Sequence, residues 1–443
     1  MRKSTMYRTA LMIALALGAS GCSVLKRKTP KTPVLGERIA VLSSEGEVTV
    51  DPALREIPMN LPPAVANTEW AQSGGNASKS VGHLALGSAL GQAWQASIGR
   101  GSSVTMRLAS APIVAGGKVF TIDAAGLVHA YDAQTGGQVW AIQTPYDKGG
   151  ENSIYGGGLA YDNGYVFATN GNGYVVALNA INGGQRWKVR PGGPLRGAPS
   201  ASSGAVYAMS QDNQIYALDQ ASGKTNWSQT AALEIAGVFG SASPAVGQGT
   251  VVAGFSSGEL NAYRYENGRQ VWQDALQRTS VTTSVSSLSD IDADPVIDSG
   301  QVYAIGQGGR MVALELSTGQ RLWEANISGI STPWVAGDWV FVVTSDAKLI
   351  CFARSTGKVR WINSLPAFVR PKNKRGQIDY SGPVLAGDRL VITSSTGAII
   401  NMNPINGSFQ SQTNVGAEIS LPPVVANSTL YVLDDKGVLH AFR

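Results

Sequence analysis

The sequence contains few of the side chains from which catalytic and metal sites are usually built. Only two cysteines and three histidines occur among the 443 residues. The histidines (His83, His129 and His440) are dispersed and no CxxC pair is present, so the pattern gives no support for a transition-metal site. Cys351 stands at a repeat position that elsewhere holds alanine, which predicts a small buried apolar residue rather than a redox centre.

Charge and long apolar runs are also scarce. Charged residues make up 15% of the chain and the formal net charge is +5. Three of the cations (Arg2, Lys3 and Arg8) lie in a segment that we expect to be removed, and subtracting these three leaves +2. A charge this small gives no case for nucleic-acid binding. The apolar stretch 9–19 is too short to span a bilayer, which needs roughly 20 residues.

The first 21 residues fit a secretory signal peptide, with a basic start, the apolar stretch and small residues before Cys22. Ala19-Ser20-Gly21-Cys22 resembles a bacterial lipobox, in which lipid is attached to the cysteine after cleavage before it. Ser23, rather than Asp, then implies transfer to the outer membrane. The alternative is an ordinary signal peptide cleaved near a cysteine. Residues 22–80 contain the basic, Pro-broken run KRKTPKTP at 26–33 and lack sustained periodicity, which predicts a flexible tether, part of it against the folded body.

Glycine, in contrast, is abundant (53 residues), and apolar residues make up 43% of the chain. A turn-and-tryptophan phrase such as YDAQTGGQVW, LDQASGKTNW or LELSTGQRLW recurs at intervals of 38 to 51 residues. Each unit reads as four short strands, which is the signature of a β-propeller. The phrase ends at seven tryptophans: Trp94, Trp140, Trp187, Trp227, Trp272, Trp323 and Trp361. An equivalent phrase, MNPINGSFQS, ends at Ser411 without a tryptophan.

Counting the upstream half of each unit gives eight blades. The eighth half, LPPVVANSTLYVLDDKGVLHAFR, stops after its third strand, and the chain has a spare phrase, GSALGQAWQASIG, at its other end. An N-terminal strand that completes the last blade would leave no open sheet edge. We therefore predict an all-β, eight-bladed propeller of four-stranded antiparallel blades over residues 81–443. Each Thr-Gly or Asn-Gly pair predicts a tight turn, and each tryptophan a staple whose N–H reaches a neighbouring backbone.

The repeat resembles that of pyrroloquinoline-quinone-dependent dehydrogenases, which are also eight-bladed. That cofactor carries three carboxylates and is held with calcium, so its site needs several cationic donors and oxygen ligands. No such cluster stands out, and the adjacent Cys pair typical of those enzymes is absent. We expect no cofactor, no metal and no catalytic residue.

Two charged segments remain. The DIDAD run, Asp290 to Asp294, does not fit an EF-hand loop, because Pro295 and Val302 stand where Gly and Glu are needed. It is read either as a solvated turn or as a patch for a protein partner. The basic run RPKNKRGQ at 370–377 is read as a solvated loop, with contact to acidic protein or lipid as the alternative.

The lipobox, the Pro-rich tether and the repeats without cofactor machinery together resemble the BamB family, lipoprotein subunits of the machine that folds β-barrels into the outer membrane. The resemblance implies a non-enzymatic scaffold on the periplasmic face that docks on the POTRA domains of BamA within the BAM complex. Unfolded outer-membrane proteins meeting exposed blade edges are a further hypothesis. The competing classes are a quinoprotein dehydrogenase and a periplasmic propeller that binds glycan or peptidoglycan.

The resemblance also implies docking residues on two neighbouring loops. One loop carries an acidic pair, which SLSDIDADP matches at Asp290 and Asp292. The other carries leucines and an arginine before G-x-S-A-P, where this chain has Val238 and Phe239 in EIAGVFGSASP. The arginine is therefore not kept at that position. An LRG occurs at Leu195-Arg196-Gly197, one blade earlier, and the docking role is not transferred to it.

Overall fold

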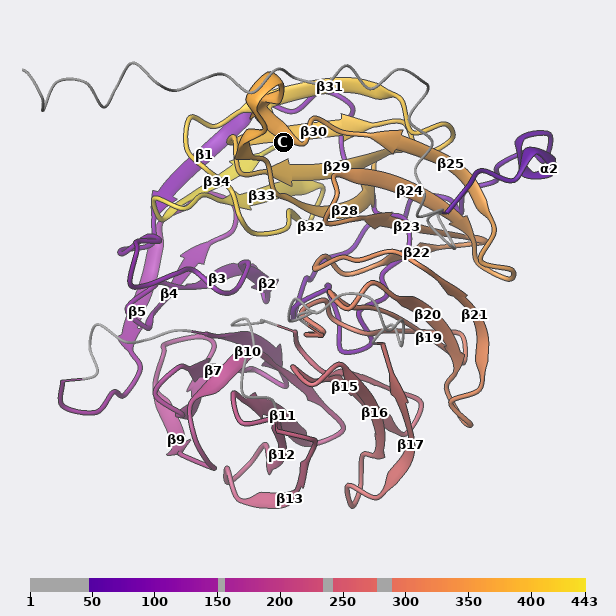
Figure 1. Cartoon of the computed structure of the whole chain (residues 1–443). Coiled ribbons are helices and arrows are strands. Elements are labelled where there is room, and N and C mark those ends of the chain that lie inside the picture. Colours follow the sequence, from indigo (N-terminus) through magenta and orange to yellow (C-terminus); the bar gives the residue numbers. More distant parts are fainter. Residues whose placement is uncertain (1–47, 150–155, 234–241, 277–288) are drawn as a thin grey trace, which may run out of the picture. The chain divides into compact units, whose positions relative to one another are not determined.

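The computed structural model describes residues 48–149, 156–233, 242–276 and 289–443. Residues 46–443 form one compact unit. Within it, eight four-stranded antiparallel sheets follow one another around an axis, as the sequence predicts (Figure 1). Among the described residues no helix has both the length and the apolar character needed to cross a membrane.

The blades are consecutive in the chain, and each begins with its innermost strand. Blade 1 contains β2 (Ile113–Ala115), β3 (Lys118–Ile122), β4 (Leu127–Asp132) and β5 (Gln138–Gln143). Blade 2 contains β6 (Gly157–Asp162), β7 (Tyr165–Asn170), β8 (Val175–Asn179) and β9 (Gln185–Val189). Blade 3 contains β10 (Leu195–Ser202), β11 (Ala205–Ser210), β12 (Gln214–Asp219) and β13 (Thr225–Thr230). Blade 4 contains β14 (Ala245–Gly247), β15 (Thr250–Gly254), β16 (Glu259–Arg264) and β17 (Gln270–Ala275).

The second half of the ring repeats this order. Blade 5 contains β18 (Val296–Asp298), β19 (Gln301–Ile305), β20 (Met311–Glu315) and β21 (Arg321–Ala325). Blade 6 contains β22 (Trp334–Ala336), β23 (Trp339–Val343), β24 (Lys348–Ala353) and β25 (Val359–Ser364). Blade 7 contains β28 (Tyr380–Ala386), β29 (Arg389–Ser394), β30 (Ala398–Met402) and β31 (Phe409–Asn414). Blade 8 contains β32 (Val424–Ala426), β33 (Thr429–Leu433), β34 (Val438–Phe442) and, from the other end of the chain, β1 (Gln92–Ser97).

Blade 8 is therefore closed by the N-terminal strand, which confirms the predicted closure. β1 pairs antiparallel with β34, with Trp94 opposite Ala441. Gly91 and Arg443 exchange two backbone hydrogen bonds of 2.7 and 2.9 Å beyond the end of the ladder. Both ends of the propeller are thus fixed in one sheet.

The repeated tryptophans connect each blade to the next, as predicted. Each indole Nε1 donates to a backbone carbonyl of the following blade at 2.7–3.3 Å. Within its own blade, each tryptophan stands opposite a small residue of the third strand. Cys351, opposite Trp361, holds that position in blade 6 and is fully buried, so it is the small core residue that the sequence predicts.

The turn glycine of each phrase is required by the tryptophan of the preceding blade. These glycines have φ between +68° and +74°, and an added Cβ would lie 2.5–2.9 Å from the indole ring. The pairs are Trp94–Gly136, Trp140–Gly183, Trp187–Gly223, Trp227–Gly268, Trp272–Gly319, Trp323–Gly357 and Trp361–Gly407. Blade 7 has Ser411 in the tryptophan position, so the seam between blades 7 and 8 has no such staple.

A segment that the sequence assigned to the tether is instead built into the propeller. Residues 65–86, here called the strap, bond to one blade after another in the order 8, 1, 2, 3, 4, 5, 6, 7. The contacts join Asn67 to Asn427, Trp70 to Val114, Ala71 to Tyr161, Gln72 to Ala201, Ala77 to Val246, Ser78 to Ile297, Gly82 to Trp334, and Leu84 to Leu385. Each partner belongs to the innermost strand of its blade or directly follows it.

The strap also closes on itself. Val65 N donates to His83 O and Ala85 N donates to Val65 O, both at 2.9 Å. Upstream of the strap, α2 (Pro52–Arg55) packs beside β25, where Arg360 Nη1 donates to the carbonyls of Leu54 and Ile57. In the described residues 48–80, backbone groups are hydrogen-bonded to the blades, so this part of the segment predicted as a tether lies against the propeller. Residues 22–47 lie outside the described part of the chain.

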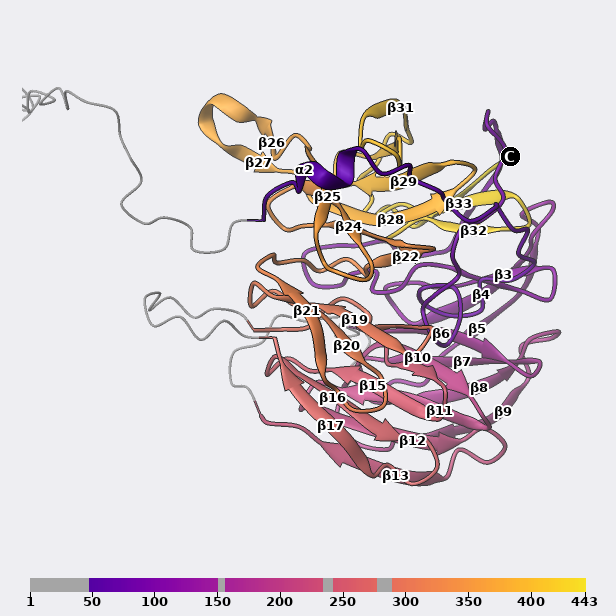
Figure 2. The same cartoon turned by 90° about the vertical axis from the view of Figure 1, so that its right-hand side faces the viewer.

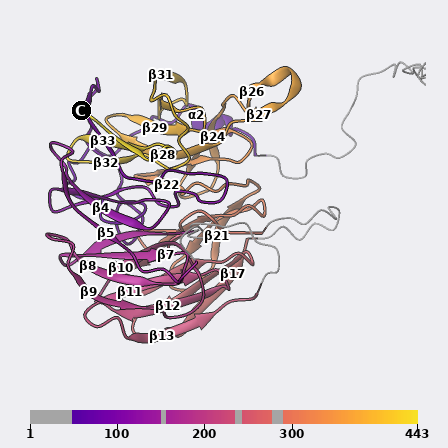
Figure 3. The same cartoon turned by 90° about the vertical axis from the view of Figure 1, so that its left-hand side faces the viewer.

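A small two-stranded hairpin stands apart from the blades. β26 (Phe368–Arg370), the 3₁₀ turn η2 (Pro371–Asn373) and β27 (Arg375–Gln377) connect blade 6 to blade 7. Figures 2 and 3 show this hairpin projecting from the propeller. It contains the basic run that the sequence singles out, in which residues 370–377 are all exposed.

Candidate functional site

The axis of the propeller contains a cavity of about 260 Å³. On one side it is lined by the strap, through Trp70, Ser73, Gly74 and Lys79. On the other it is lined by segments that lead into or begin the innermost strands of blades 1, 3, 5, 6, 7 and 8. The strap bonds to the innermost strands around the axis, so the cavity lies between the strap and the segments that enter the blades.

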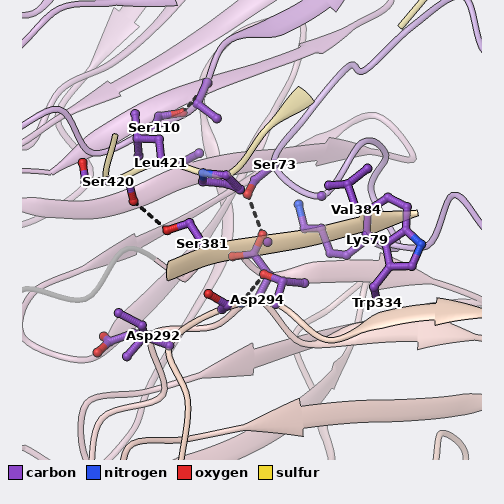
Figure 4. Close-up of a pocket in the computed structure, with 18 of the residues that line it drawn as sticks. Ser73, Lys79, Ser110, Asp292, Asp294, Trp334, Ser381, Val384, Ser420 and Leu421 are labelled. Carbon is purple, nitrogen blue, oxygen red and sulfur yellow. Dashed lines mark hydrogen bonds between the residues drawn. The ribbon is translucent and has the colours of Figure 1, made fainter. Parts of the chain in front are cut away.

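A buried pair of opposite charges lies where the strap meets this cavity (Figure 4). Lys79 is 2% exposed and its Nζ donates to Ser200 Oγ at 2.9 Å. Burial lowers the pKa of Lys79 to about 8, although the nearby Asp294 carboxylate favours the protonated form. Asp294 accepts from Ser73 Oγ at 2.6 Å and from Ser243 N at 2.7 Å. Burial raises the pKa of Asp294.

The acidic segment 290–294 is held from several sides rather than projecting into solvent. Asp290 is 0% exposed and Asp292 is 9% exposed. Gln307 Nε2 donates to Asp292 Oδ2, and Gln307 N donates to Asp290 O. Ile291 N donates to Phe255 O at 3.2 Å, from blade 4. The segment is thus a buried junction between blades 4 and 5.

The cation that faces this junction is Arg196, which comes from β10 of blade 3. Arg196 is 4% exposed, and its Nη2 donates to Gly254 O at 3.0 Å and to Ile291 O at 3.4 Å. Burial lowers the pKa of Arg196, while Asp292 and Asp290 favour its charged form. Burial likewise raises the pKa of Asp292, against the effect of Arg196.

Sequence reasoning set Arg196 aside because it lies one blade too early. The long side chain of Arg196 crosses from blade 3 to the carbonyls of Gly254 and Ile291, a contact that the spacing of the repeats does not reveal. The LRG phrase is the sequence feature that points to this arginine. Of the other predicted contact residues, Val238 and Phe239 lie outside the described residues, as does Cys22.

The histidines of the repeat positions have structural partners. His129 Nδ1 lies 2.5 Å from Tyr131 Oη, and His440 Nε2 lies 3.0 Å from Asp434 Oδ2. His83, in the strap, binds Pro62 O through Nδ1 at 2.7 Å. Within the described ranges, no three or more His, Cys, Asp or Glu side chains are grouped so that they could hold a metal ion.

Eight four-stranded blades around a closed axis, seven of them with a stapling tryptophan, define the class of eight-bladed PQQ-like-repeat propellers. The family model described as "Outer membrane protein assembly factor BamB" matches residues 87–154 and 124–363. The chain belongs to the BamB family.

Individual relatives agree with this assignment. The outer membrane protein assembly factor BamB of Yersinia pestis is 27% identical over 75% of this chain and 83% of its own length. The crystal structure of BamB from Moraxella catarrhalis superposes with a TM-score of 0.65 at 21% identity, covering 80% of this chain and 98% of that one. A europium-containing methanol dehydrogenase superposes equally well (TM-score 0.66, 14% identity, 82% and 89% coverage) and shows only that the fold is shared.

The shared fold raises the question of whether the axial cavity suits a quinone cofactor. A group with three carboxylates needs several cationic donors. Among the described lining residues, Lys79 is the one cation, and it lies beside Asp294 and bonds Ser200. Asp292 and Asp294 add carboxylates of the wrong sign. The cavity therefore does not fit this cofactor.

Proposed function

We propose that the chain is a non-enzymatic scaffold of the outer-membrane β-barrel assembly machinery, anchored by lipid at Cys22 on the periplasmic face and docking on the POTRA domains of BamA. Family membership supports the role in outer membrane protein assembly, because the relatives carry that name. A cavity whose charges do not suit the quinone supports a binding role over dehydrogenase chemistry.

The buried junction of Arg196, Asp290 and Asp292 is the observation that most directly supports a docking surface beside blades 4 and 5. These buried charges hold the end of the segment that leads into β18, and Ser243 N, just before β14, donates to the neighbouring Asp294 at 2.7 Å. Buried carboxylates cannot themselves form the outer contact surface. We propose instead that Asp290 and Asp292 position the docking surface and that Val238 and Phe239 contribute apolar contacts to it.

Copurification from detergent-solubilised envelopes tests this proposal. Wild type should bring down BamA, and Val238→Glu/Phe239→Glu should lose it without a change in unfolding midpoint. Val139→Glu/Ile181→Glu, two exposed apolar positions in blades 1 and 2, is the matched control and should retain BamA. Asp290→Asn/Asp292→Asn should weaken capture and lower stability together. Absence of BamA from the wild-type sample would overturn the scaffold proposal.

Exposed blade edges support a second role, the capture of unfolded barrel strands. Residues next to α2 already add to one edge: Val50 forms a parallel bridge with Val359, and Asp51 N donates to Val359 O at 2.8 Å. β31 offers an edge in which all six residues are exposed and uncharged. An added extended segment would complete its ladder. Ser411→Lys/Thr413→Lys should abolish protection of an unfolded barrel against aggregation, whereas Lys substitutions on β9, which is already charged, should not.

A further inference from the structure

The hairpin β26–β27 concentrates positive charge that no carboxylate of the described residues neutralises. Arg370, Lys372, Lys374 and Arg375 lie within six residues, all exposed. In the described part of the molecule, none of the four forms an ion pair with a carboxylate within 4.0 Å. The nearest acid in the sequence, Asp379, accepts instead from Gln377 Nε2 at 3.2 Å.

The register of the hairpin makes this concentration costly. Arg370 stands directly opposite Arg375 across the ladder, and like charges in that position destabilise a strand pair. A two-stranded hairpin has little stability of its own in water. Val369, beside the cations, is 61% exposed. Stability alone would favour an acid at one of the two positions, so the pattern points to an external anionic partner.

The position of the hairpin indicates which anionic surface is within reach. Figures 2 and 3 show it projecting on the side of the propeller where the described chain begins, drawn in indigo. Cys22 precedes residue 48 by 26 residues, a stretch that spans at most about 90 Å. A lipid anchor at Cys22 would therefore keep a phospholipid surface within reach of this side.

We propose that the β26–β27 hairpin binds the anionic phosphate headgroups of the membrane that carries the anchor. The four cations supply electrostatic attraction, and Val369 supplies an apolar contact at the headgroup level. The hairpin would then give the propeller a preferred orientation relative to that membrane. This inference rests on the lipid anchoring proposed above, and it assigns no role to the BamA contact.

Vesicle sedimentation tests the proposal without the lipid anchor. Residues 46–443, the compact unit, are mixed with phosphatidylcholine vesicles with or without phosphatidylglycerol. Wild type should bind only the vesicles that contain phosphatidylglycerol, and binding should weaken with added salt. Each cation near an anionic surface contributes about a fivefold gain in binding, so Lys372→Gln/Lys374→Gln should bind about 30-fold more weakly.

The matched control removes the same charge elsewhere. Lys188→Gln/Lys224→Gln changes two exposed lysines of blades 2 and 3 and should change binding by less than about twofold. Equal losses in the two double variants would overturn the proposal, as would competition by inorganic phosphate that exceeds the effect of sodium chloride at the same ionic strength. Loss of BamA copurification in the hairpin variant, with vesicle binding unchanged, would reassign the hairpin to an acidic protein. Vesicle loss with BamA retained supports the membrane contact whether or not the docking site is correct.

Discussion

The indole of Trp94 lies over Gly136 of the next blade. A Cβ at Gly136 would lie 2.6 Å from Trp94 Cε3, and Trp94 Nε1 donates to Ala133 O at 3.2 Å. Trp94 belongs to β1, the N-terminal strand of blade 8, whereas Gly136 belongs to blade 1. The contact that joins successive blades elsewhere thus also closes the ring.

Replacing a turn glycine that packs under a tryptophan should lower the free energy of unfolding more than replacing a turn glycine with no close neighbour. Gly223→Ala places its Cβ 2.7 Å from Trp187 at φ +73°, so strain and overpacking add. We expect about 2–4 kcal/mol of destabilisation in urea unfolding. Gly204→Ala, in the same blade at φ +78° with nothing within 4 Å, should cost about 1 kcal/mol. Equal losses would show that the indole contact contributes little.

Removing the buried guanidinium should unfold the junction between blades 4 and 5. Arg196→Met leaves Asp290 and Asp292 without their cation and should cost about 3–5 kcal/mol at neutral pH. Protonated carboxyls need no cation, so the defect should shrink as the pH falls. Adding Asp290→Asn/Asp292→Asn should restore part of the loss, and Arg264→Met, an exposed control, should be near neutral. Failure of the added substitutions to rescue would argue against charge coupling.

The buried Lys79 should make the free energy of unfolding depend on pH. Burial lowers the pKa of Lys79 from 10.5 to about 8, so between these values the unfolded chain holds the proton and the folded chain does not. The free energy of unfolding should therefore rise with pH across this window, by on the order of 3 kcal/mol. Lys79→Met should lose this rise. Denaturant unfolding of both proteins at pH 7.5 and pH 10 measures the difference, and parallel pH profiles would contradict the prediction.

The strap should contribute measurably to the stability of the propeller through the side chain of Gln72. Its Nε2 donates to Ala201 O at 2.6 Å and its Oε1 accepts from Ala201 N at 3.0 Å, both buried. Gln72→Ala leaves two backbone groups unpaired, at about 1–3 kcal/mol each. Thermal unfolding should shift accordingly, whereas Gln95→Ala on exposed β1 should change it little. If Gln72→Ala lowered the unfolding temperature no more than Gln95→Ala does, water would be taking over the hydrogen bonds that the Gln72 amide makes to Ala201.

The propeller could be predicted because its determinants are local and repeated. Each turn glycine and tryptophan occupies a fixed place within a unit, so blade number, closure by β1 and the staple at Trp94 follow from spacing. Cys351 was predictable for the same reason. These residues interact with their own blade or the next one.

The strap and the charged junction could not be predicted in this way. Residues 65–86 are not repeated, and their partners are spread along the chain from Val114 to Asn427. Arg196 looked misplaced because its side chain reaches across a blade. The acidic run at Asp290 and Asp292 read as a surface patch because sequence pattern does not distinguish a buried carboxylate from a solvated one when its partners come from three other segments.

The strap has a consequence for the order in which the molecule is completed. Residues 65–86 leave the ribosome before any strand of the blades, yet their partners include Asn427 and Leu385, near the end of the chain. This early segment must wait until nearly the last residues are in place. A chain truncated within blade 7 or 8 would leave the strap partly unbonded. The strap is therefore fully hydrogen-bonded only when all eight blades are present.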